Sequence, residues 1–548
     1  MADMQIKELF ALDIGRPIEE VIKVDQDDAQ IVYDEISEYI VTDSILKHYL
    51  QILNKYWETK NKPHEGIGIW VSGFFGSGKS SFAKMLGLAL ESRDVLGESA
   101  AELFIKRLGN EKAQVLLGQI TEQIPTEAVI FDVSTDRGIR SGNQSITEIM
   151  YKLFLKKLGY AEDLDLAELE ISLEEASQLD RFKEAYQGKH AQSWDQDKNK
   201  ISFALVKASV VMHQLDPGTY TAPDSWVQAA KDKADITAGK LAERCRDLMK
   251  RRGESKNLVF VVDEVGQFVS RDVQKMLDLM GVVQSLGRIS RGKAWLIVTS
   301  QEKLTELVSG LDDKRVELAR LMDRFPIQVH LEPSDISEVT SKRVLSKNAA
   351  AEKLLRDLFA THSGRLMANT KLTADIKLPD LSTDNFMDLY PLLPYQIDLI
   401  IEVVSGLRTQ GGASKHVGGA NRTIIKLAQQ LLIHDSVGLA KQPVGSLARI
   451  DQIYDLVAGN IPSEIRGKIT AIEKDVEHSL AQPVAKAICL LQYVQNIHRT
   501  AENIAGTLQA TVAGDSVLTD VKQALEQLVN SHKVRLHDGQ YRIPTPAE

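Results

Sequence analysis

The stretch between Ile67 and Ala83 constrains the fold more than any other part of the sequence. It reads I-G-I-W-V-S-G-F-F-G-S-G-K-S-S-F-A: an apolar run, a glycine-rich turn and the start of a helical pattern that continues to about Glu91. A buried strand, a turn of the form G-x-x-x-x-G-K-S and a helix in this order are typical of a phosphate-binding loop. Glycines let backbone N–H groups surround phosphate oxygens, and the helix N-terminus adds partial positive charge.

This loop predicts a site for ATP and Mg²⁺. Lys79 is expected to reach the β- and γ-phosphates, and the Ser80 hydroxyl is expected to ligate Mg²⁺. The predicted cofactor-binding residues of the loop are Gly73, Phe74, Phe75, Gly76, Ser77, Gly78, Lys79, Ser80 and Ser81. Ile40 and Val41, which precede a strongly amphipathic helix, either line an adenine pocket or serve only in packing.

Four further apolar runs alternate with helical patterns, which predicts a five-stranded parallel α/β sheet. They are residues 128–133, 258–262, 294–298 and 327–331. Asp263 and Glu264 follow the second of these runs, and ligands of open α/β sheets bind at the carboxyl ends of the strands. We therefore expect Asp263 to hold Mg²⁺ and Glu264 to polarise the water that attacks the γ-phosphate.

Two more candidates lie beside the later strands. Thr299, or its neighbour Ser300, ends the fourth strand and either contacts the γ-phosphate or the attacking water, or caps a helix. Arg324 precedes the fifth strand, a position that suits a charge delivered to a neighbouring subunit, and Arg320 and Arg315 are alternates. This assignment predicts a homo-oligomer.

Composition limits the classes of function. The 548 residues predict three to four domains, and no apolar run approaches the length of about 20 residues that spans a bilayer. Two distant cysteines and an N-terminus without a signal-peptide pattern favour a cytoplasmic protein without a membrane role. With a net charge of −10, any binding to nucleic acid requires a local basic patch.

The expected organisation has four parts. They are an N-terminal helical segment (1–65), an α/β core (66–333) with a helical insertion at about 160–255, a helical lid (334–460) and a winged helix (461–548). The acidic start of the insertion is either a solvated face or a docking surface for a basic partner. The last part shows three helices and a hairpin around Asp538 and Gly539, a layout that binds either double-stranded DNA or protein.

Arg422 opens a helix in a basic stretch of the lid. No acidic residue occurs between Val403 and His434. Three uses remain open for Arg422: presentation to the phosphates by the lid, contact with nucleic acid, or a solvated helix start.

Together these residues resemble an AAA+ ATPase. Gly73–Ser80 resembles its phosphate loop, Asp263-Glu264 its acidic strand end, Thr299 its first sensor, Arg324 its arginine finger and G-A-N-R ending at Arg422 its second sensor. A core, a helical lid and a winged helix in this order are similar to the origin-recognition and initiator branch.

A narrower resemblance lies in the first eighty or so residues. L-F-A-L-D-I-G-R-P-I-E-E-V-I-K-V-D-Q, E-Y-I-V-T-D and above all I-G-I-W-V-S-G-F-F-G-S-G-K-S resemble the BrxC/PglY P-loop proteins of BREX and phage-growth-limitation systems. Ser81 stands where many members have histidine, and members tend to be much longer, which suggests a fragment or a shortened relative. The resemblance implies a role in phage defence, with other defence subunits and DNA as partners.

The sequence thus predicts a Mg²⁺-dependent ATPase that changes conformation with its nucleotide. The alternative is an initiator-like scaffold that binds DNA or protein and holds ATP as a structural ligand with little turnover.

Overall fold

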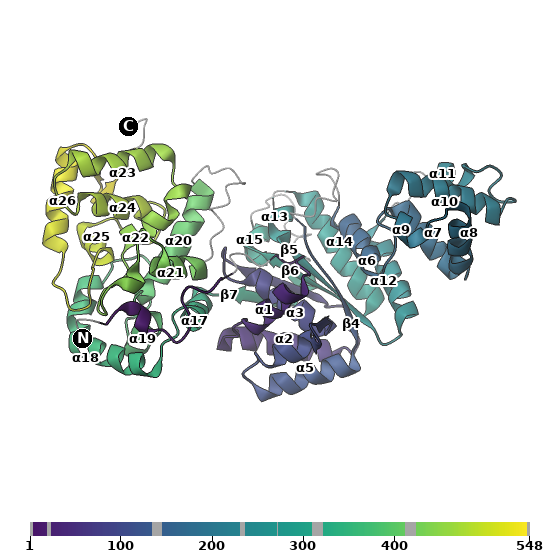
Figure 1. Ribbon diagram of the computed structural model, residues 1–548, viewed down its shortest axis with the longest axis horizontal. Coiled ribbons are helices and arrows are strands. Elements are labelled where there is room, and N and C mark those ends of the chain that lie inside the picture. Colours follow the sequence, from purple (N-terminus) through teal and green to yellow (C-terminus); the bar gives the residue numbers. More distant parts are fainter. Residues whose placement is uncertain are drawn as a thin grey trace.

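Five parallel strands form the central sheet of the computed structural model (Figure 1). The structure describes residues 4–18, 23–133, 145–230, 236–270, 272–309, 322–410 and 424–544. The strands are β1 (Gly68–Gly73), β4 (Thr126–Asp132), β5 (Asn257–Asp263), β6 (Ala294–Ser300) and β7 (Ile327–Leu331). Each corresponds to a predicted run, so the expected five-stranded parallel α/β sheet is confirmed.

The strand order is β4-β5-β6-β1-β7. The chain leaves β1 for the far edge at β4, returns through β5 and β6, and then places β7 on the other side of β1. β1 is therefore the strand at which the direction of winding reverses, and ligands of open α/β sheets bind outside the carboxyl ends of strands at such a point. The glycine-rich loop follows β1 at this edge.

Helices cover both faces of the sheet (Figure 1). α3 (Lys79–Glu91) packs on β4, β5 and β6, with α2 (Asp43–Glu58), α4 (Ala100–Ile105) and α5 (Glu111–Gln123) beyond it. α12 (Ala238–Arg252) and α14 (Val273–Ser290) pack on β5 and β6 and on each other. A short α13 (Val265–Val269) joins β5 to α14.

The chain between α3 and α4 is not helical. The structure has a two-stranded hairpin there, β2 (Asp94–Val95) and β3 (Glu98–Ser99). Leu96 and Gly97 form its turn with φ of 55° and 89°. Positive φ at both central residues matches the twist of a two-residue hairpin.

The helical insertion has an apolar core of its own. It contains α7 (Leu164–Glu175), α8 (Leu179–His190), α9 (Trp194–Asp197), α10 (Ile201–Leu215) and α11 (Ser225–Ala230). Two helices of the sheet domain connect to it, α6 (Ile146–Lys157) on the way out and α12 on the way back. Figure 1 shows the insertion at one end of the molecule and the C-terminal helices at the other.

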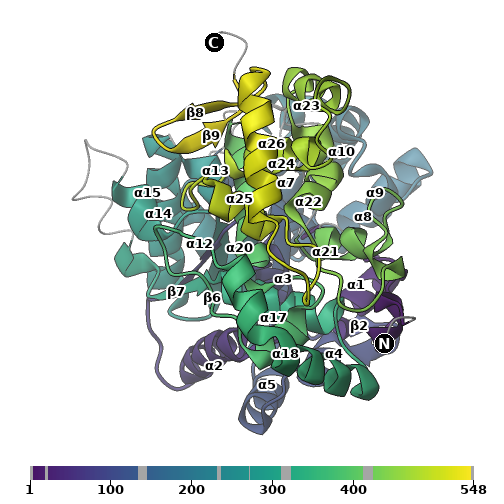
Figure 2. The same ribbon diagram turned by 90° about the vertical axis from the view of Figure 1, so that its left-hand side faces the viewer.

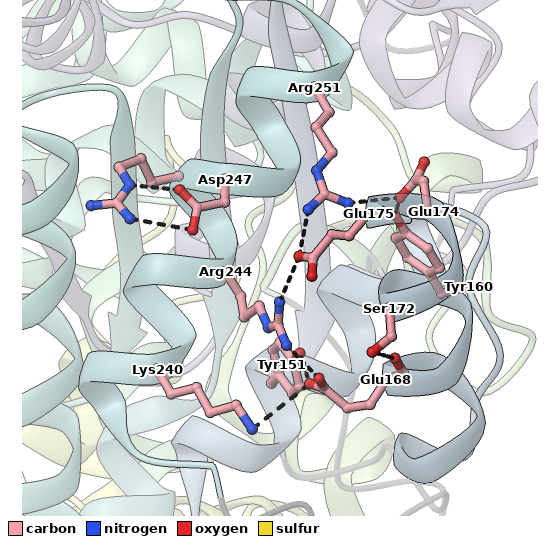
Figure 3. A network of polar contacts seen from close by, with 11 residues as sticks. Tyr151, Tyr160, Glu168, Ser172, Glu174, Glu175, Lys240, Arg244, Asp247 and Arg251 are labelled. Carbon is pink, nitrogen blue, oxygen red and sulfur yellow. Dashed lines mark hydrogen bonds and ion pairs between the residues drawn. The ribbon is translucent and has the colours of Figure 1, made fainter. Parts of the chain in front are cut away.

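The acidic start of the insertion binds basic residues of the same chain (Figure 3). Glu168 and Glu175 pair with Arg244 of α12, and Glu174 and Glu175 pair with Arg251. Ion pairs of this partly exposed kind contribute up to about 1 kcal/mol each. These three carboxylates therefore hold α7 against α12, a use that neither of the two predicted alternatives included.

Residues 333–410 and 424–543 gather around a second large apolar cluster. Figure 2 looks onto this half of the molecule. Its first helices are α17 (Pro333–Arg343), α18 (Ala349–Thr370), α19 (Thr383–Leu389), α20 (Pro394–Gln410), α21 (Ile424–Ile433), α22 (Ile450–Val457) and α23 (Ser463–Asp475). The three helices and the hairpin expected at the end are α24 (Ala481–Leu491), α25 (Ala501–Thr507), α26 (Leu518–Asn530), β8 (Arg535–His537) and β9 (Gln540–Arg542). The winged-helix assignment stays a prediction, and these last elements share one core with the helices before them.

The N-terminal segment is divided between the two cores. A 3-10 helix, η1 (Ile6–Leu9), and Ile18 belong to the C-terminal cluster, whereas Val24, α1 (Ala29–Ser37) and α2 belong to the sheet domain. The backbone N–H of Ile6 donates to the carbonyl of Gln442 at 2.9 Å. Among the described residues, no helix is both long and apolar enough to cross a membrane.

Two helical glycines offer a matched test of how closely α3 packs on the sheet. A Cβ at Gly87 would lie 2.8 Å from Cγ2 of Val261 in β5, whereas a Cβ at Gly118 of α5 would meet nothing within 4 Å. We expect Gly118→Ala to stabilise the fold by about 0.5–1 kcal/mol through helix propensity. Gly87→Ala should destabilise it by about 1–3 kcal/mol because the core has no room. Denaturant unfolding measures both, and equal stabilisation by the two variants would contradict this account of the packing.

Candidate functional site

The glycine-rich loop is shaped by close approaches that side chains would block. A Cβ at Gly73 would lie 2.5 Å from Oγ of Ser77, and Gly76 and Gly78 adopt φ of 80° and 89°. Left-handed backbone of this kind strongly favours glycine. The sequence therefore folds into a tight turn directly ahead of the N-terminus of α3.

The interior of the loop carries polar groups suited to an anion. Lys79 is only 4% exposed, and its Nζ lies 3.5 Å from the carbonyl oxygen of Phe74. The hydroxyl of Ser77 is buried and has no hydrogen-bond partner in the described part of the chain. A buried ammonium, an unsatisfied hydroxyl and a helix N-terminus fit the phosphates of a nucleotide.

Ser80 and Asp263 meet at the carboxyl edge of the sheet. Oγ of Ser80 donates to Oδ1 of Asp263 at 3.0 Å. Neighbouring ligands of an octahedral Mg²⁺ lie about 3 Å apart when each bond is about 2.1 Å. The two predicted metal ligands therefore fit one Mg²⁺.

A third carboxylate, which the sequence reasoning missed, lies beside this pair. Asp132 ends β4 in register with Asp263 on β5. Burial raises the pKa of Asp263, the hydrogen bonds from Thr299 and Ser80 oppose this, and the charge of Asp132 adds to the increase. The signal was available, because Asp132 ends an apolar strand in the same way as Asp263 does.

Thr299 contacts the acidic pair in this structure. Its side chain is 0% exposed, and its Oγ1 donates to Oδ1 of Asp263. The same oxygen accepts the backbone N–H of Glu264 at 2.9 Å. These hydrogen bonds make Thr299 a support for the two neighbouring acids. Contact of Thr299 with the γ-phosphate or the attacking water, and its alternative use as a helix cap, stay predictions.

The backbone of Glu264 lies in the left-handed region, with φ of 57° and ψ of 24°. A residue with a side chain pays about 1–2 kcal/mol to adopt this conformation. The hydrogen bond to Thr299 and the start of α13 at the next residue hold it there. Strained backbone that neighbours hold in place is common at functional sites.

Arg324 lies near the amino ends of the strands, whereas the phosphate loop lies at their carboxyl ends. It precedes β7, whose first residue, Ile327, is paired with Ile69, whereas the loop begins after Gly73 at the other end of β1. Four residues of strand span about 13 Å. The guanidinium of Arg324 has no hydrogen bond or ion pair with any described residue, so it does not complete the site of its own chain in this structure.

The remaining predicted site residues lie around the loop. Ile40 and Val41 are half-buried between α1 and α2, and Thr42 next to them caps α2 and donates to Asp335 of α17 at 2.7 Å. Ser81 lies partly exposed on the first turn of α3. These adenine and loop assignments stay predictions.

Arg422 lies outside the described residues, as do the alternates Arg315 and Arg320. The helix that Arg422 was predicted to open is described from Ile424. A Cβ at Gly76 would lie 4.0 Å from Cδ1 of Ile424, so α21 begins beside the phosphate loop.

Comparisons with known proteins give only loose similarity. No protein-family model matches the sequence. The ORC2 protein of Aeropyrum pernix, solved as ADPNP–ADP complexes, is 10% identical and has a TM-score of 0.30, with 93% of this chain and 92% of that chain covered. A Walker-type ATPase of Pyrococcus abyssi is 12% identical with a TM-score of 0.24, covering 90% and 91% of the two chains. The sheet and the site geometry described above, rather than these similarities, define the core.

Thr299 offers a direct test of the site. Thr299→Val keeps the shape of the side chain but leaves the Glu264 N–H without its acceptor, a loss of about 1–3 kcal/mol. We expect its nucleotide turnover to fall at least tenfold while affinity for a fluorescent ATP analogue changes by less than about threefold. Thr299→Ser, which keeps the hydroxyl, should retain most of the turnover. Equal turnover in the valine and serine variants would exclude this role for the hydroxyl.

Proposed function

We propose that this chain is a Mg²⁺-dependent AAA+ ATPase that works as a nucleotide-driven switch in an oligomer. The observation that carries the proposal is the continuous set of hydrogen bonds from Ser80 through Asp263 and Thr299 to Glu264. It connects the phosphate loop after β1 with the acidic end of β5, although β6 lies between these two strands in the sheet.

Each residue has a role in this proposal. Lys79 and the loop N–H groups hold the phosphates, and Ser80 and Asp263 hold Mg²⁺. Bound Mg²⁺ neutralises charge on the phosphate oxygens. Glu264 orients the attacking water and accepts its proton, and the hydrogen bond to Thr299 fixes the backbone from which the Glu264 carboxylate extends.

Arg324 serves a neighbouring copy in this proposal. Its position beyond the far end of β1 and its guanidinium without a described partner support action in trans. A cation delivered by a neighbour stabilises negative charge in the transition state of phosphoryl transfer. Arg422 is proposed to be presented to the phosphates by the lid.

We place this ATPase in a BREX-type phage-defence complex. The run W-V-S-G-F-F-G-S-G-K-S supports this context, and other subunits of the system and double-stranded DNA are the proposed partners. For α26, contact with protein is the use that the charges favour. The exposed face of α26 carries Asp520 and Glu526, and Lys522 is paired with Glu502.

Glu264→Gln tests the hydrolytic role. The variant should bind a fluorescent ATP analogue as the wild type does, and its phosphate release should fall at least a hundredfold because the amide cannot accept a proton. Glu243→Gln, which changes an exposed acid on α12, is the matched control and should be unaffected. Phosphate release is measured with and without duplex DNA. Wild-type turnover near zero in both conditions would favour the scaffold over the ATPase.

The trans role of Arg324 is tested by mixing variants. Arg324→Ala and Lys79→Ala should each be inactive alone, but their mixture should recover activity because the second variant supplies the missing arginine. Arg288→Ala, at an exposed arginine of α14, should keep wild-type activity by itself. Native mass measurement with and without ATP and Mg²⁺ shows the oligomer. Absence of recovery at every mixing ratio, with mixed oligomers present, would contradict action in trans.

A further inference from the structure

Trp70 is the large aromatic residue of β1, and it has no role in the proposed hydrolysis of ATP. Its side chain is 0% exposed, and its backbone lies between Val298 of β6 and Gln328 of β7. It precedes the phosphate loop in the run W-V-S-G-F-F. The contacts of its indole ring show what it holds.

The indole connects two segments that are distant in sequence. Its Nε1–H donates to the carbonyl oxygen of Glu302 at 3.2 Å. The ring also meets the ring of Phe325 edge to face, with centroids 5.4 Å apart and planes at 81°. Phe325 is 0% exposed and directly follows Arg324.

The backbone of Arg324 is pressed against the same strand. A Cβ at Gly68, two residues before Trp70, would lie 2.3 Å from the carbonyl oxygen of Arg324 and 2.7 Å from the ring of Phe325. Gly68 therefore lets the turn approach β1, and Trp70 holds the Phe325 ring from the side. Together they fix the backbone at Arg324 while its guanidinium has no described partner.

The turn that accepts the indole N–H lies against the helix that follows Asp263 and Glu264. The backbone N–H of Glu302 donates to Oγ of Ser300 at 3.1 Å. A Cβ at Gly266 of α13 would lie 2.0 Å from that same oxygen, so Ser300 packs directly on the helix that begins after Glu264. Ser300 and α13 thus hold the turn that accepts the indole N–H.

We propose that Trp70 is a positioning residue that sets Arg324 for use by a neighbouring copy of the chain. This inference rests on the proposed function, because it requires that Arg324 acts in trans. The indole fills the space between β1 and Phe325, and its N–H holds the turn at Glu302. The Arg324 side chain then extends from a fixed backbone, which reduces the number of conformations that must be restricted when it enters another site.

If Trp70 positions Arg324, its substitution should matter in the subunit that donates Arg324 and not in the subunit that receives it. In a mixture of Lys79→Ala and Arg324→Ala subunits, the first donates the arginine and the second provides the phosphate loop. Trp70→Phe in the donor removes the indole N–H and leaves a smaller ring. The recovered turnover should then fall at least fivefold. The same substitution in the receiving subunit, whose residue 324 is alanine, should change the recovered turnover by less than twofold.

Trp295 supplies a matched control. It is 1% exposed, its Nε1–H donates to the carbonyl of Gly292 at 2.9 Å, and its ring lies 5.4 Å from that of Tyr56. Trp295→Phe in the donor loses the same kind of hydrogen bond and the same volume, and should leave the recovery within twofold. Thermal unfolding and native mass of each donor show that it folds and enters the mixed oligomer. If Trp70→Phe does not fold, Phe325→Leu in the donor removes the contacting ring and should show the same asymmetry.

The outcomes separate this inference from the proposed function. No recovery with the unmodified donor would contradict the trans site itself, whatever Trp70 does. Full recovery with the Trp70→Phe donor, or an equal loss whether the substitution is in the donor or in the receiver, would overturn the positioning role. Loss confined to the donor, with Trp295→Phe unaffected, is the expected result.

Discussion

The hydroxyl of Thr299 joins the two acids on which the site depends. It donates to the Asp263 carboxylate and accepts the backbone N–H of Glu264. Because the side chain is fully buried, no water competes for either bond, and the short turn after β5 keeps one conformation. Ser80 extends this arrangement to the phosphate loop. The Thr299 hydroxyl on β6 thereby holds both acids at the end of β5, and the Ser80 hydroxyl links that end to the loop after β1.

Much of this could be predicted from the sequence because the signals are local. Each strand is a short apolar run that can be recognised in the sequence. Once the run is recognised, the polar residue at its carboxyl end is identified as well. Asp263, Thr299 and the phosphate loop were found in this way, and the structure brings them together. Asp132 ends β4 in the same way, and only the register of β4 with β5 shows that it lies beside Asp263.

The rest depends on contacts between distant residues, which no local pattern records. The acidic start of the insertion was predicted to be a solvated face or a docking surface, but Arg244 and Arg251 from a helix about seventy positions later pair with three of its carboxylates. The hairpin at residues 94–99 is a local feature, but it depends on a turn with positive φ at Leu96, a residue type that rarely adopts this conformation. Trp70 lies in the run that carries the family resemblance, and its contacts with Glu302 and Phe325 could not be read from that run.

The division of the N-terminal segment has a geometric consequence. The chain passes from the C-terminal cluster to the sheet domain between Ile18 and Val24, and it returns between Leu331 and Ile336. Two chain connections between two bodies restrict their relative movement more than a single connection does. The helical half also packs on the phosphate loop itself, because Phe74 and Phe75 lie against the C-terminal cluster. The loop therefore lies where the two cores meet, and a substitution that enlarges or shrinks either phenylalanine changes the packing of the helical half as well as that of the loop.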